Sequence, residues 1–160
     1  MNNAGYSFIS KSLYEYEFYT AYGAGYSVLF DSASSYFPAN NKVTDLIFSI
    51  DIQLIYPGAY NHYDLVIGIT IAEIILIFFN ADNRHIIFYI CDPVDGKMAA
   101  RSRKFNYWFN TFGSKEFKKI VAVLKGESII VEANFIFKKD NVFAYDLPII
   151  IDEAKDNLSK

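Results

Sequence analysis

The chain has 160 residues, of which 52% are hydrophobic and 18% aromatic, and its formal net charge is −3. So many apolar residues exclude a disordered chain, because they bury enough surface on folding to offset the entropy of ordering. We therefore expect one globular domain over residues 1–160, with residues 1–12 as a loose leader.

Cys91 is the only cysteine, so no disulfide can form within the chain, and a reducing, cytoplasmic location is expected. It ends an apolar run, which indicates a small buried side chain rather than a nucleophile. The first residues lack the basic and apolar regions of a signal peptide. The apolar run 65–79 is shorter than the roughly 20 residues that a membrane span needs, and it contains Glu73. We therefore expect a soluble protein without a membrane segment.

The first predicted structure is a β-hairpin. Residues 14–19 alternate between aromatic and acidic residues, which indicates a strand with its two glutamates facing solvent. Gly23 and Gly25 supply a turn, and apolar residues alternate again over 26–30. These two runs predict an antiparallel pair.

A long strand and an apolar helix are expected next. Residues 46–54 alternate apolar and polar residues, which predicts a strand with one solvent-exposed face, ended by Pro57. Asp64 can cap a helix over 65–79, which is apolar nearly all round and therefore buried on more than one side. Its β-branched residues leave a strand as the alternative. Residues 86–91 are continuously apolar, which predicts a short strand covered on both faces.

The second half of the chain predicts a helix, a hairpin and a closing helix. The first helix spans about 97–112 and ends at Gly113, the hairpin pairs 117–124 with 129–137, and the last helix covers 149–158. In the second hairpin strand, Glu132 and Asn134 alternate with apolar residues and mark a polar face. The fold class that follows is α+β: a mostly antiparallel sheet of about six strands, two main helices packed on it, and a short C-terminal helix.

Charge is unevenly distributed. Residues 1–96 contain three Lys or Arg against ten Asp or Glu, whereas residues 97–125 contain eight Lys or Arg against Glu116 alone. A single basic block in an acidic chain can contact a polyanion, an acidic protein, or the acidic region of a second copy.

The turn and helix start at 92–104 are the candidate binding site. Loops that follow strand ends often carry function, because they converge on a rigid scaffold. Three roles are open. In the first, two acids bind a divalent cation while an arginine holds a phosphate or carboxylate. In the second, the basic side chains bind an external anion, and in the third, all of these groups serve the fold as helix caps and ion pairs. The candidate residues are Asp92, Asp95, Lys97, Arg101, Arg103 and Lys104.

No metal, cofactor or catalytic residue is predicted. His62 and His85 are the only histidines, and neither has a second histidine or a cysteine at ligand spacing. The sequence also lacks the phosphate-binding, dinucleotide-binding, serine hydrolase and zinc protease motifs.

The pattern C-D-x-x-D-G-K-x-x-x-R-x-R-x-F-x-x-W-F over residues 91–109 resembles a family of small bacterial proteins of unknown function. A weaker likeness to the same family extends towards the N-terminus as far as residue 14 and includes Phe18, Gly23 and Tyr26. The resemblance implies a bacterial, cytoplasmic, single-domain protein and carries no activity with it.

Three functions follow from these features. The first is a non-enzymatic interaction protein that forms a homo-oligomer, which the aromatic excess and the charge segregation favour. The second is a nucleic-acid or polyanion binder using the block 97–125, against which the sequence pI of about 5.3 argues. The third is a small hydrolase or nuclease centred on Asp92, Asp95 and Arg101.

Overall fold

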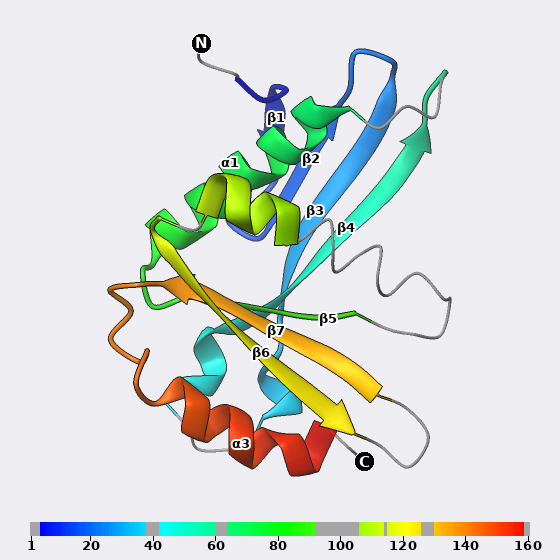
Figure 1. Cartoon of the computed structure of the whole chain (residues 1–160). Helices are drawn as coiled ribbons and strands as arrows, with labels where there is room; N and C mark the ends of the chain where they lie inside the picture. Colours follow the sequence, from blue (N-terminus) through cyan, green and yellow to red (C-terminus); the bar gives the residue numbers. More distant parts are fainter. Residues whose placement is uncertain are drawn as a thin grey trace. The chain divides into compact units, whose positions relative to one another are not determined.

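A computed structural model of the chain describes residues 4–37, 42–59, 64–91, 106–113, 115–125 and 130–158 (Figure 1). Its strands are β1 (Phe8–Ser10), β2 (Glu15–Tyr19), β3 (Ala24–Ser32), β4 (Ile47–Pro57), β5 (Ile86–Cys91), β6 (Phe117–Lys125) and β7 (Ile130–Lys138). Its helices are α1 (Leu65–Ala81) and α3 (Leu147–Leu158), with short helical turns η1 (Ser34–Tyr36), η2 (Thr44–Leu46) and η3 (Phe109–Gly113).

The seven strands belong to one sheet in the order β1-β2-β3-β4-β5-β7-β6. The β4–β5 pair is parallel, whereas β1–β2, β2–β3, β5–β7 and β7–β6 are antiparallel. The predicted α+β class is therefore confirmed, with seven strands instead of about six. Contacts divide the chain into two compact units, unit 1 (residues 1–31 and 50–82) and unit 2 (residues 32–49 and 83–160). The prediction of a single domain over 1–160 stays a prediction.

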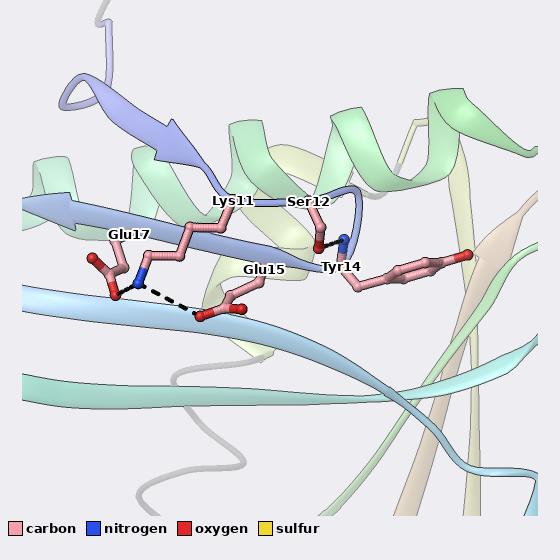
Figure 2. A network of polar contacts seen from close by, with 5 residues as sticks. All are labelled: Lys11, Ser12, Tyr14, Glu15 and Glu17. Carbon is pink, nitrogen blue, oxygen red and sulfur yellow. Dashed lines mark hydrogen bonds and ion pairs between the residues drawn. The ribbon is translucent and has the colours of Figure 1, made fainter.

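The β2–β3 hairpin of unit 1 is the one that the sequence predicts. Its register runs from Glu15 opposite Leu29 to Tyr19 opposite Gly25. One face is buried and aromatic, while on the other Lys11 bonds to Glu17 and lies 3.7 Å from a carboxylate oxygen of Glu15 (Figure 2). This ion pair lies in solvent and adds little stability.

Helix α1 confirms the helix predicted for the apolar run and excludes the alternative strand. Asp64 caps it, because its Oδ1 atom accepts a hydrogen bond from the Val66 amide at 2.8 Å. Phe78 packs its ring on Phe30 with 4.0 Å between centroids, and Tyr14 meets Phe78 edge-on at 6.3 Å. These contacts cover the aromatic face of the hairpin within unit 1. In the described part of the chain, no helix combines the length and apolar character that crossing a membrane requires.

The predicted loose leader is wrong for the residues that the structure describes. Residues 8–10 form β1, which pairs with β2. Ahead of it, the Gly5 amide donates to Glu73 Oε1 at 3.1 Å, and the Tyr6 amide donates to Thr70 Oγ1 at 2.8 Å. The two polar residues in the middle of α1 therefore bind this segment. A Cβ on Gly5 would lie 2.8 Å from the Cα atom of Thr70 in the backbone of α1, so the close approach requires glycine.

The Tyr6 hydroxyl also donates to Asp64, and this contact predicts a loss of stability in alkali. Burial raises the pKa of Tyr6 above the ordinary value of 10.0, and the hydrogen bond to Asp64 raises it further. A raised pKa means that folding favours the protonated phenol. The stabilisation is therefore complete below pH 10 and is lost as the pH rises through the folded-state pKa.

We expect Tyr6→Phe to lower the free energy of unfolding by about 1 kcal/mol at pH 8, and by less above pH 10. Urea unfolding of both proteins at several pH values measures this difference. If the difference in the free energy of unfolding between the two proteins were the same above pH 10 as at pH 8, this prediction would be contradicted.

Strand β4 departs from its prediction beyond Gln53. Asp51 and Gln53 are exposed, as the alternation requires. However, Leu54 and Tyr56 are also exposed, by 52% and 64%. The alternation predicts which side chains share a face, but it does not predict whether another element covers that face.

Unit 2 packs α3 on the β5–β7–β6 part of the sheet (Figure 1). Phe135 of β7 lies at the centre of this core, with its ring centroid 5.1 Å from that of Phe88 and 5.9 Å from that of Phe37. The helix α3 starts at Leu147, two residues before its predicted start, and has Pro148 in its first turn, where the missing N–H costs no helical hydrogen bond. Its core contacts come from the buried residues Leu147, Ile150, Ile151 and Ala154.

Candidate functional site

The six predicted site residues all lie outside the residues that the structure describes. Asp92, Asp95, Lys97, Arg101, Arg103 and Lys104 fall in the undescribed stretch 92–105. A binding role for them therefore stays a prediction, and the described side of the site consists of the elements that flank this stretch.

Strand β5 leads directly into the candidate turn. It lies between β4 and β7, and Ile86 to Tyr89 are buried, as predicted for a strand covered on both faces. Ile90, close to the turn, is already 38% exposed. The carboxyl end of this central strand thus lies at the edge of the covered region.

Polar side chains from β7 lie beside this strand end. In the β5–β7 register, Tyr89 is opposite Asn134 and Cys91 is opposite Glu132, so all four positions share one face of the sheet. Asn134 is only 1% exposed, and its Nδ2 donates to Glu132 Oε1 at 3.3 Å. The Asn134 Oδ1 atom is buried, and no described residue donates a hydrogen bond to it.

The sequence missed the burial of Asn134 in this polar pair. The alternation in β7 predicts a polar face for Glu132 and Asn134, but the burial of Asn134 shows that this face is covered. In the sequence, Asn134 appears only as an amide side chain between apolar strand residues. Such a side chain is more often exposed to solvent than buried. A buried carbonyl oxygen beside a carboxylate suits an N–H donor or a cation.

The other flank is the end of the predicted helix. Residues 106–108 are helical, and η3 continues them as a π-helical turn that includes Gly113, which the sequence places just beyond the helix. Lys119 of β6 donates to the Asn106 side chain, and its Nζ atom lies 5.6 Å from the centroid of the Phe109 ring. These contacts hold the helix end against β6 within unit 2.

The described part of the basic block does not form one cationic face. Lys118 and Lys119 are consecutive strand residues, so their side chains point to opposite faces of the sheet. Lys119 already contacts Asn106 and Phe109. Lys115 is exposed, and its carbonyl oxygen accepts from Lys139 Nζ at 2.7 Å.

The histidines and acids of the described residues offer no metal centre. His85 is 5% exposed, and its ring meets Phe48 edge-on at 5.1 Å. No group of three or more His, Cys, Asp or Glu side chains with metal-binding geometry occurs among the residues described. His62 falls outside them.

A family of unknown function, DUF6169, matches residues 63–152, which is more than half of the chain. The chain belongs to this family. The DUF6169 match includes α1, β5, β6, β7 and the pattern over 91–109, whereas the β2–β3 hairpin precedes it. No curated protein and no solved structure matches the chain. Membership of DUF6169 supplies no activity.

Proposed function

We propose that this member of DUF6169 is a non-enzymatic interaction module that self-associates into a homodimer. The observation that supports it best is β6, which ends the sheet and, among the strands that the structure describes, pairs with β7 alone. Val121 and Val123 of this outermost strand are 47% and 51% exposed. Exposed valines on a long edge strand are typical of a surface that pairs with another chain.

Further exposed apolar side chains support an interaction surface in preference to a closed monomer. In unit 2, Ile130 is 60% exposed at the start of β7. In unit 1, Tyr19 and Tyr56 are 50% and 64% exposed. Tyrosine is enriched in protein interfaces, because its ring is apolar and its hydroxyl tolerates partial hydration.

Polyanion binding is the weaker proposal. It requires several cations on one accessible face, yet Lys118 and Lys119 point to opposite faces and Lys119 contacts the helix end. A hydrolase or nuclease centred on Asp92, Asp95 and Arg101 has no support from the described residues, since all three lie outside them.

Light scattering over a range of concentrations tests the proposed function. We expect a species with twice the 18.3 kDa mass of one chain at high micromolar concentration, and elution from heparin at low salt. A mass of one chain throughout would contradict self-association. Retention on heparin by a monomer would favour the polyanion binder instead.

A further inference from the structure

The outer edge of β6 is the surface from which a more specific inference follows. We propose that two copies of the chain pair through β6, antiparallel and centred on Val121, so that the sheet continues across a two-fold axis. This inference rests on the proposed self-association and names the surface that carries it.

The backbone of β6 supplies the hydrogen bonds for this pairing. Its nine residues, Phe117 to Lys125, pair with β7 along one edge. In an antiparallel ladder, each neighbour uses the N–H and C=O groups of alternate residues. The remaining groups of β6 point away from β7, and no described strand bonds to them. Backbone groups along an exposed sheet edge are a template for a further strand, and a second β6 strand can pair with them.

The side chains of β6 place apolar residues at the centre of the strand. The stretch 120–124 reads Ile-Val-Ala-Val-Leu and contains no glycine or proline. The lysines of the strand, Lys118, Lys119 and Lys125, lie towards its ends. Lysine on an edge strand commonly prevents pairing, but here the central five residues carry no charge.

The register centred on Val121 is self-complementary. It pairs all nine residues and sets Lys118 opposite Leu124, Lys119 opposite Val123, and Lys125 opposite Phe117. In this register no lysine lies directly opposite another lysine. Two lysines facing each other would repel and destabilise the pair of strands.

The two neighbouring registers are less favourable. Centring the pair on Ala122 sets Lys119 opposite Lys125, whereas centring it on Ile120 pairs only Phe117 to Val123 and leaves Leu124 and Lys125 without a partner strand. A two-fold axis perpendicular to the sheet must pass through a pair of identical residues, because opposite residues share a face. Val121 is therefore the position where the two copies meet.

Cysteine cross-linking tests the register. In the Val121→Cys variant, the two introduced thiols lie directly opposite each other, with Cβ atoms about 4.5–5.5 Å apart. We expect a short bis-maleimide, which adds one thiol to each of its two double bonds, to give covalent dimers at least about tenfold faster than in Val142→Cys, whose native side chain is 65% exposed outside β6. The unmodified protein controls for Cys91.

Charge reversal at the same position gives an independent test. Val121→Lys places two lysines opposite each other and is expected to weaken dimerisation about tenfold, while Val142→Lys leaves it unchanged. Mixing Val121→Lys with Val121→Glu should restore a dimer containing one of each, because the opposite charges then meet. The half-exposed native valine makes both variants compatible with folding.

The outcomes separate the inference from the proposed function. Equal cross-linking rates for Val121→Cys and Val142→Cys, in a protein that light scattering shows to be dimeric, would overturn the β6 pairing and leave self-association intact. A monomeric wild-type chain would overturn both. Failure of the mixed Lys and Glu variants to dimerise would overturn the two-fold at Val121.

Discussion

Replacing Phe135 by alanine is expected to lower the free energy of unfolding by about 3–5 kcal/mol. Phe135 is fully buried in β7, and its ring contacts Phe88 of β5 and Phe37 after η1. Truncation removes these contacts and leaves a cavity that the sheet cannot fill, since the neighbouring Ala133 carries only a methyl group.

Chemical unfolding of the variant, with Val142→Ala as the matched control, measures this effect. The Val142 side chain is 65% exposed, so its truncation should change stability by less than about 0.5 kcal/mol. Equal stability of the two variants would show that unit 2 is not built around Phe135.

Replacing Gly58 by alanine is expected to destabilise unit 1 by about 2–5 kcal/mol, more than the same change at Gly23. Both glycines have positive φ, 66° at Gly58 and 81° at Gly23, which costs an alanine roughly 1–2 kcal/mol. A Cβ at Gly58 would also lie 2.6 Å from the Ala24 amide nitrogen and 2.9 Å from the Tyr22 carbonyl oxygen. Overpacking of this kind adds about 1–3 kcal/mol.

Gly23 is the control for backbone conformation alone, because a Cβ there meets nothing within 4 Å. Thermal or urea unfolding of both variants gives the difference. We expect Gly58→Ala to be the less stable protein, and a Gly23→Ala variant that is equally unstable would contradict the steric reason.

The sequence predicts those elements whose signal is local. Alternating aromatic and acidic residues specify the β2–β3 hairpin, and Asp64 before an apolar run specifies the start of α1. These features depend on neighbours in the chain, such as the Asp64 carboxylate and the Val66 amide, so periodicity and capping rules identify them.

Strand β1 could not be predicted in this way. Three residues are too few to show a period, and the segment before them is held by Glu73 and Thr70, which lie more than sixty residues away in sequence. In the sequence, the polar groups of Glu73 and Thr70 indicate a solvent-exposed edge of α1, whereas in the structure they accept hydrogen bonds from the Gly5 and Tyr6 amides. Such long-range hydrogen bonds produce no periodic pattern in the sequence.

The burial of Asn134 could not be predicted either, because it also depends on contacts that are distant in the sequence. Asn134 is in a polar position of an alternating strand, and its burial depends on what covers that face of the sheet. The residues Asp92 to Lys104, which lie outside the described part of the structure, remain a binding site that the sequence alone predicts.

Hydrogen exchange of the β6 amides at two protein concentrations is the most direct test of pairing through this strand. At low concentration, we expect fast exchange for the alternate amides in residues 117–125 that do not bond to β7, and slow exchange for those that do. At high concentration, the fast set should become protected, while the exchange of β1 amides stays unchanged. Fast exchange of that set in the dimer would contradict pairing through β6.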